Sequence, residues 1–178
     1  WVQERLDIEP EYFKKLSQGQ SPEILYIGCS DSRVSSEELM GVGPGDVFVH
    51  RNIANMVPNT DLNSMSVINY AVEHLEVKHV VVCGHYYCGN IRDVYRIHKD
   101  ELSLIEDEEE RYKKFVELNV QEQCVNVIKT ADVQKAIRNR NLTVHGWVFD
   151  IHSGKLIDLK IDFDAILENI MEIYRLDE

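Results

Sequence analysis

Short apolar runs, separated by stretches with helical spacing, constrain the fold of this chain most. Ile24–Cys29 and Val80–Cys83 are almost wholly apolar, as strands buried on both faces are, and Asp46–His50 lies between them as a third short strand. Residues 61–76 carry apolar side chains at spacings of three and four, which predicts an amphipathic helix capped by Asp61. Strands that alternate with helices in this way predict a parallel β-sheet covered by helices on both faces.

The second half of the chain continues this alternation and adds a hairpin. Apolar spacing predicts helices over residues 88–98 and 115–128 and a final helix over residues 166–173. Residues 142–149 form a fourth predicted strand, which a tight turn joins to an antiparallel partner over residues 156–161. We therefore expect an α/β fold, in which a parallel β-sheet with one added antiparallel strand is flanked by helices.

The length of 178 residues suits a single domain with a full apolar core. Residues 1–20 mix polar and apolar side chains, with Phe13 and Leu16 at helical spacing, and predict an N-terminal helical arm that ends near Pro22. We expect residues 21–178 to form the α/β domain that carries the functional site.

Charge and cysteine content argue against several classes of protein. Lys and Arg number 19 against 31 Asp and Glu, and the resulting net charge of −12 would repel the phosphate backbone of a nucleic acid. No apolar stretch approaches the ~18 residues of a membrane span. Four Cys at irregular spacing do not suit a disulfide scaffold, so we expect a reducing compartment and a cytoplasmic protein. The start at Trp1 leaves open a targeting segment that has been removed.

Polar side chains follow three of the predicted strands at the points where these strands end. In an open parallel sheet the carboxyl ends of neighbouring strands meet at one edge, and ligands bind there. The side chains expected at this edge are Cys29, Asp31, Arg33, Arg51, His85 and Cys88.

Two thiolates and an imidazole among these side chains form a ligand set that suits zinc. The spacing of His85 and Cys88 across a strand end lets both reach one ion, and Cys29 comes from the neighbouring strand end. Three protein ligands leave a fourth position open, as in catalytic zinc sites. The alternative is that all three are ordinary core residues, but charged side chains beside a buried strand end favour the metal site.

Asp31 and Arg33 follow Cys29 by two and four residues. A carboxylate so close to a metal could bind it, or could accept a proton from metal-bound water. An arginine paired with the carboxylate would hold it off the metal and keep it ionised. An ordinary structural ion pair is the alternative interpretation.

Three motifs follow one another at a specific spacing: Cys-Ser-Asp-Ser-Arg at 29–33, His-Arg-Asn-Ile-Ala-Asn at 50–55 and Cys-Gly-His-Tyr-Tyr-Cys-Gly at 83–89. Together they resemble the motifs of the β-class carbonic anhydrases. The similarity spans residues 8–162 and includes Asn119-Val120, Gln123 and Val144-His145-Gly146-Trp147.

This resemblance implies one Zn²⁺ per chain, held by Cys29, His85 and Cys88, with Asp31 and Arg33 as the catalytic pair. The implied reaction is the reversible hydration of carbon dioxide to bicarbonate and a proton, by attack of zinc-bound hydroxide. The family's fold is a parallel sheet with an added antiparallel strand, in an obligate homodimer that often pairs into a tetramer. The N-terminal arm typically packs on the partner subunit.

Two further groups of residues are candidates within this resemblance. Candidates for the lining of a pocket for carbon dioxide are Val34, Tyr70 and Gly89. Some family members bind a second bicarbonate between a Trp, an Arg and a Tyr, and the matching positions here are Tyr26, Arg51 and Phe149. Because Phe149 offers no hydrogen-bond donor, we expect this second site to be weak or absent.

Two other functions compete with the hydration of carbon dioxide. Carbon disulfide and carbonyl sulfide hydrolases resemble the same family, and motifs at the metal do not separate them from carbonic anhydrases. A non-catalytic zinc-binding domain is the other alternative. The Asp31–Arg33 pair argues against it, because a structural zinc site needs neither an open position nor a carboxylate beside it.

Overall fold

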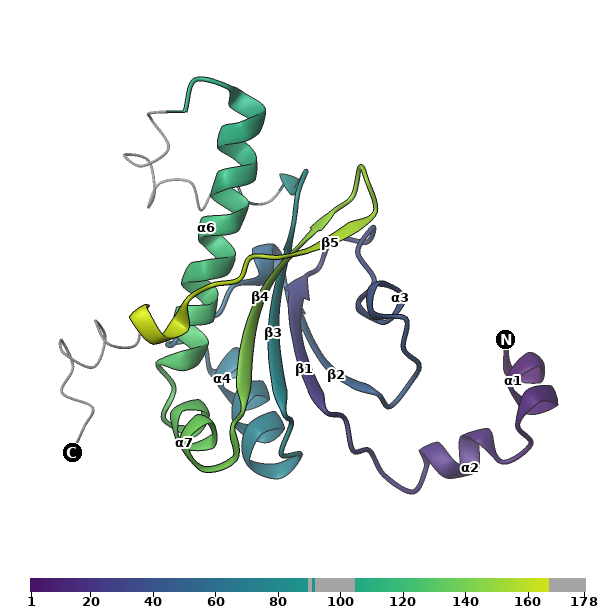
Figure 1. Ribbon diagram of the computed structural model, residues 1–178. Coiled ribbons are helices and arrows are strands. Elements are labelled where there is room, and N and C mark those ends of the chain that lie inside the picture. Colours follow the sequence, from purple (N-terminus) through teal and green to yellow (C-terminus); the bar gives the residue numbers. More distant parts are fainter. Residues whose placement is uncertain (90, 92–104, 167–178) are drawn as a thin grey trace.

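A five-stranded β-sheet forms the centre of the computed structural model, which describes residues 1–89, 91 and 105–166 (Figure 1). The strand order is β2-β1-β3-β4-β5, with the first four strands parallel and β5 antiparallel to β4. The added antiparallel strand is as predicted. The strands are β1 (Ile24–Cys29), β2 (Val47–Asn52), β3 (His79–His85), β4 (Thr143–Asp150) and β5 (Lys155–Asp158).

The register of the strands brings their carboxyl ends together. Cys29, the last residue of β1, is paired with Asn52 at the end of β2, and Gly28 is paired with Cys83 of β3. His85 therefore lies one residue beyond the end of β1 on the adjacent strand. These strand ends form the edge at which the sequence predicts a ligand site.

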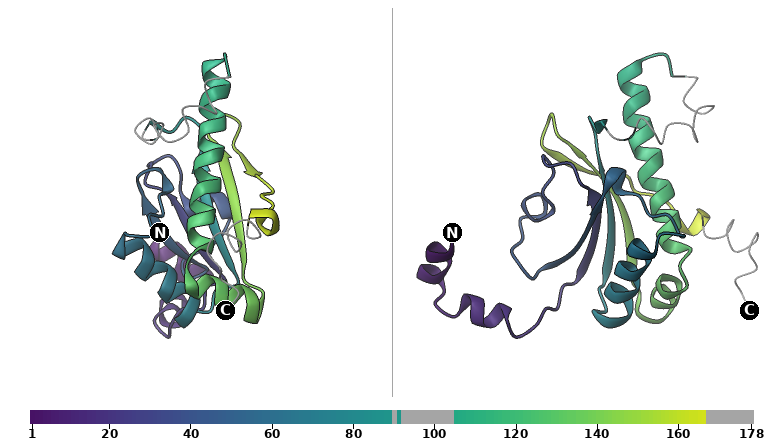
Figure 2. Two further views of the ribbon diagram at one scale, coloured as in Figure 1. Left: turned by 90° about the vertical axis from the view of Figure 1, so that its left-hand side faces the viewer. Right: turned by 180° about the vertical axis from the view of Figure 1, so that it is seen from behind.

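Helices lie on both sides of the sheet, but unequally. The helices α4 (Leu62–Asn69), α6 (Glu108–Ile128) and α7 (Ala131–Arg140) lie on one side, and α3 (Ser36–Met40) lies on the other (Figures 1 and 2). The larger apolar core is on the side of α6. Tyr26, Val81 and Cys83 form a smaller buried cluster that points to the opposite side.

Glycine allows α6 to approach the sheet closely. A Cβ atom on Gly84 would lie 2.6 Å from Val120 Cγ2, and one on Gly146 would lie 3.2 Å from Val120 Cγ1. The first distance leaves no room for a side chain, because real Cβ atoms essentially never come within 3.0 Å of a neighbour, and the second is tighter than most real Cβ contacts. The buried face of α6 therefore rests almost directly on the backbones of β3 and β4.

Several helices differ from the prediction. The predicted helix over 61–76 divides into α4 and a π-helical turn, η2 (Tyr70–His74). Asp61 caps α4 as expected, because its carboxylate accepts hydrogen bonds from the backbone N–H groups of Asn63 and Ser64. The structure adds α3 and α7, which apolar spacing did not reveal. The helix predicted over 88–98 and the final helix lie largely outside the described residues.

Residues 1–20 contain two short helices, α1 (Val2–Ile8) and α2 (Tyr12–Leu16), rather than one. Pro10 explains the break, since the residue before a proline is disfavoured in helical conformation, and Glu9 is extended. The two helices project from the body of the molecule (Figure 1). Across the described part of the chain, no helix is both long and apolar enough to cross a membrane.

Candidate metal centre

The three side chains predicted to bind a metal lie together. Cys29 ends β1, His85 ends β3, and Cys88 follows β3 after a turn of two tyrosines. All three are buried, and one potential ligand atom from each lies within 4.8 Å of the other two. The two sulfur atoms are 3.9 Å apart.

This geometry fits a zinc ion. Two sulfurs that bind one tetrahedral zinc at ~2.3 Å are about 3.8 Å apart, close to the spacing of Cys29 and Cys88. The Nδ1 atom of His85 lies 3.0 Å from the carbonyl oxygen of Tyr86. The other ring nitrogen, Nε2, is buried and has no hydrogen-bond partner within the described chain. A ring fixed through one nitrogen, with the other free, is the usual arrangement of a metal-binding histidine.

The thiols of the chain differ in their electrostatic environment. The Cys88 thiol holds the pKa of Cys29 far below its usual range; the His85 ring and the N–H groups of Asp31 and Ala54 act in the same direction, against the effect of burial. In contrast, burial raises the pKa of Cys83 to about 11. Only the first kind of environment favours the thiolate that a metal requires.

Asp31 and Arg33 form a close ion pair beside these ligands. Arg33 donates through Nη2 to Asp31 Oδ2 at 2.7 Å and through Nε to Asp31 Oδ1 at 2.9 Å. These bonds are the main reason that the pKa of Asp31 lies well below its usual range. Asp31 Oδ2 is 3.7 Å from His85 Nε2, so an ionised carboxylate lies directly beside the three potential ligands.

Arg51 contacts the loop of the site rather than an open pocket. Its Nε donates to the carbonyl oxygen of Cys29 at 2.8 Å, and its Nη2 donates to that of Asp31 at 2.6 Å. Tyr26 and Phe149, the other two positions that match the second bicarbonate site, belong to the small apolar cluster on the sheet. The Tyr26 hydroxyl is buried beside the Cys83 thiol, and burial raises its pKa. Two donors of Arg51 are thus already engaged by the backbone.

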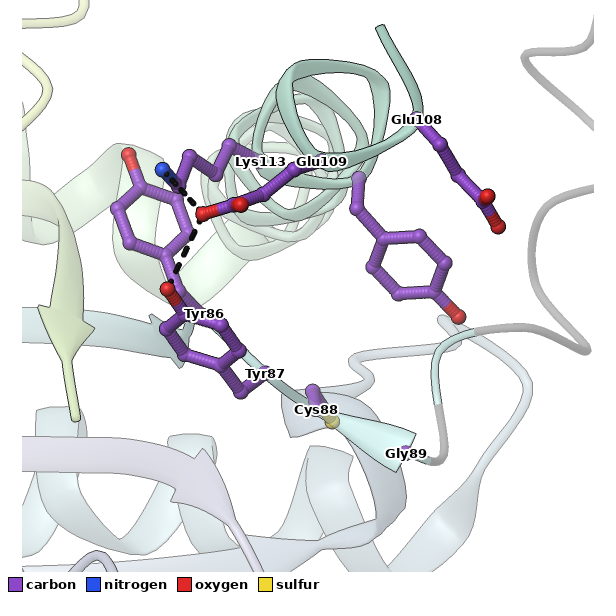
Figure 3. A pocket seen from close by; sticks show the side chains of 8 residues that line it. Tyr86, Tyr87, Cys88, Gly89, Glu108, Glu109 and Lys113 are labelled. Atoms are coloured by element: carbon purple, nitrogen blue, oxygen red, sulfur yellow. Dashed lines mark hydrogen bonds and ion pairs between the residues drawn. The ribbon is translucent and has the colours of Figure 1, made fainter. Parts of the chain in front are cut away.

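A cavity of about 650 Å³ adjoins the candidate metal centre at Cys88. It lies between the turn after β3 and the first turns of α6, as Figure 3 shows. The residues that line it are Tyr86, Tyr87, Cys88, Gly89, Glu108, Glu109, Tyr112 and Lys113. The Tyr87 hydroxyl donates to Glu109 Oε1 at 3.1 Å, and Lys113 Nζ pairs with the same oxygen at 2.8 Å.

One of the three candidates for the carbon dioxide pocket lines this cavity, and the other two do not. Gly89 lines it, whereas Val34 and Tyr70 are not among its lining residues. Val34 is buried in the protein interior. The ring of Tyr70 lies between those of Phe48 and His74, with centroids 5.7 and 5.2 Å away.

The sequence does not predict the turn that follows β2. Ala54 and Asn55, which follow β2, have left-handed backbone conformations with φ of 59° and 49°. Asn119 of α6 donates to the carbonyl oxygen of Ala54 at 3.0 Å. The available signal was the position of Asn119 and Gln123, two amides one helical turn apart within an apolar helix face. That signal does not say which backbone groups the amides meet.

Comparison with known proteins gives a consistent result. Residues 24–156 match the family described as carbonic anhydrase. A curated carbonic anhydrase of Emericella nidulans is 56% identical over 99% of this chain and 86% of its own length.

Solved structures agree with this similarity. A β-carbonic anhydrase of Aspergillus fumigatus has a TM-score of 0.88 at 36% identity, covering 98% of this chain and 93% of its own. One of two tetrameric β-carbonic anhydrases of Sordaria macrospora has a TM-score of 0.85 at 41% identity, covering 90% of this chain and 92% of its own.

Proposed function

Because the chain belongs to the β-carbonic anhydrase family, we propose that it catalyses the reversible hydration of carbon dioxide to bicarbonate and a proton. One observation carries this proposal beyond family membership. The buried cluster of Cys29, His85 and Cys88 lies beside an ionised Asp31, which Arg33 holds in place. A structural metal site would need no such carboxylate.

The proposed cofactor is one Zn²⁺ per chain, with Cys29, His85 and Cys88 as its ligands. Zinc bound there would supply a water of pKa about 7 that can attack carbon dioxide at neutral pH. The chain's own contribution is the geometry of the ligands. Tyr86 fixes the His85 ring through Nδ1, and the buried positions of both cysteines exclude bulk solvent from the sulfurs.

Asp31 is the proposed acceptor of a hydrogen bond from the attacking water. Its low pKa keeps it in the accepting, ionised form. Arg33 binds both oxygens of the carboxylate, and a second bond from Arg33 Nη2 to the carbonyl oxygen of Tyr87, at 3.2 Å, ties the pair to the loop of Cys88. Arg33 therefore holds the Asp31 carboxylate in one orientation beside the proposed metal ligands, where it can accept that hydrogen bond.

We also propose that the functional unit is a homodimer, or a dimer of two such dimers. The Sordaria macrospora relatives are tetrameric. Residues 1–20, proposed as an arm distinct from the α/β domain of residues 21–178, expose 61% of Trp1 and 81% of Ile8. Apolar side chains on a projecting arm are expected to pack on another subunit.

A comparison of substrates tests the proposed reaction. The purified, zinc-loaded protein should hydrate carbon dioxide in a stopped-flow assay with a pH indicator. The same samples are assayed for sulfide release from carbon disulfide and carbonyl sulfide. Sulfide release without carbon dioxide hydration would contradict the proposal and assign the fold to the hydrolase alternative.

A further inference from the structure

Two amide side chains of α6 connect that helix to the loop after β2. Asn119 and Gln123 are 2% and 3% exposed. Gln123 Nε2 donates to Asn119 Oδ1 at 3.1 Å, so the amides form a pair. Asn119 Nδ2 then donates to the carbonyl oxygen of Ala54, and Gln123 Oε1 accepts from the N–H of Val57 at 2.8 Å. The amide pair thus forms hydrogen bonds with both ends of the segment Ala54–Val57.

The segment held in this way has an unfavourable backbone conformation. Ala54 and Asn55 are consecutive left-handed residues, and Ala54 is completely buried. The left-handed conformation is unfavourable for a residue with a Cβ atom. Two successive residues of this kind adopt it only where the surrounding structure imposes it. The hydrogen bonds from the side chains of Asn119 and Gln123, to Ala54 on one side of Asn55 and to Val57 on the other, are suited to impose this conformation.

The same segment faces one of the proposed zinc ligands. Asn52, which immediately precedes Ile53 and Ala54, is paired with Cys29 in the sheet. The backbone N–H groups of Ala54 and Asp31 lower the pKa of the Cys29 thiol, as hydrogen bonds to its thiolate would. Groups that hydrogen-bond to a metal ligand orient it and tune its basicity. The direction of the Ala54 N–H depends on the left-handed conformation, and hence on the amide pair.

The close contact between α6 and the sheet makes this connection possible. Gly84, which precedes His85, has no side chain to separate β3 from Val120. Val120 follows Asn119, so the approach that Gly84 permits also brings Asn119 within reach of Ala54.

We propose that Asn119 and Gln123 are positioning residues for the metal centre. They fix the Ala54–Asn55 turn so that the Ala54 N–H remains on the Cys29 sulfur. This inference rests on the proposed function, because it requires a metal at Cys29. The competing explanation is that the amides only stabilise the fold.

The test compares full-length Asn119→Ala and Gln123→Ala with two controls. Gln121→Ala removes a solvent-exposed amide from the same helix. Val133→Ala removes buried apolar volume from α7, away from the turn, and reports the effect of lost stability alone. The two readouts are the rate of zinc release to a chelator and the sulfur-to-cobalt charge-transfer absorption of the cobalt-substituted protein.

Both amide variants should release zinc about 10- to 100-fold faster than the unmodified chain. They should also shift the charge-transfer band, while both controls leave the band unchanged. Zinc release within twofold of the unmodified chain, or a band shift as large in Val133→Ala, would overturn the inference.

Gln123→Glu decides the question if the alanine variants do not fold. This variant keeps an acceptor for Val57 and, when ionised, replaces the donor to Asn119 with a charged acceptor oxygen, so the bond between the two side chains is lost and a change of the same sign is expected. An unchanged band in this variant would also overturn the inference. Failure of the unmodified chain to bind zinc would instead contradict the proposed function itself.

Discussion

At the scale of single residues, the orientation and the ionised state of Asp31 are set by its neighbour Arg33. Arg33 occupies both carboxylate oxygens, and the side chain of Asp31 is only 12% exposed. Asp31→Asn preserves the size of the side chain but replaces an accepting oxygen with an N–H donor. We expect the variant to retain zinc and to lose about 100-fold or more in hydration rate. Metal content and turnover measured together check this, and near-normal turnover with zinc present would remove Asp31 from the mechanism.

Arg51 leads to a prediction about inhibition. Its bonds to the carbonyl oxygens of Cys29 and Asp31 engage two of its donors, and Phe149 provides none. The loss of one hydrogen bond to a charged ligand costs about 1.5–3 kcal/mol, or about 10- to 100-fold in affinity. We therefore expect no steep, bicarbonate-sensitive loss of activity as the pH falls below about 8. Hydration rates measured with and without added bicarbonate check this, and a steep loss would show that an inhibitory site exists.

The sequence predicts the residues of the site better than their contacts. Cys29, Asp31 and His85 could be placed together because each follows or ends a strand of a parallel sheet. The carbonyl acceptors of Arg51 and the left-handed turn at Ala54 could not be predicted, because they depend on loop conformation and on a helix 65 residues further along the chain.

At the scale of elements, the contact between α6 and β3 connects the core to the metal centre. A Cβ atom at Gly84 would meet Val120 Cγ2 at 2.6 Å and Val116 Cγ1 at 3.2 Å. Gly84→Ala should therefore lower the free energy of unfolding by about 1–3 kcal/mol, as overpacking of a core does. Gly43→Ala is the matched control, since a Cβ atom there would lie 3.6 Å from Asp46 Oδ2, an ordinary van der Waals contact. Denaturant unfolding measures both, and equal stability of the two variants would contradict a tight contact.

Strands were easier to predict than helices for a physical reason. β1 and β3 are buried along almost their whole length, so their sequences are continuously apolar. In contrast, α3 is a single five-residue segment, and α7 has only two buried residues, Val133 and Ala136. Neither helix leaves an apolar pattern long enough to detect.

At the scale of the whole molecule, the N-terminal arm leads to a prediction about assembly. The exposed apolar side chains of α1 favour a dimer or a larger assembly, and the net charge of −12 keeps that assembly in solution. Sedimentation of the full chain should show at least a dimer, and removal of residues 1–20 should weaken the association. A monodisperse monomer of the full chain at micromolar concentration would contradict this assignment.

The central claim is that Cys29, His85 and Cys88 hold a zinc ion on which the hydration of carbon dioxide depends. It is tested most directly by zinc content and hydration rate, determined on the same samples of the unmodified chain and of Cys88→Ser. A serine hydroxyl is a poor zinc ligand compared with a thiolate. We predict one zinc per chain with rapid hydration for the unmodified protein, and the joint loss of zinc and activity in Cys88→Ser. Full zinc content in Cys88→Ser, or hydration that is independent of zinc, would contradict the account.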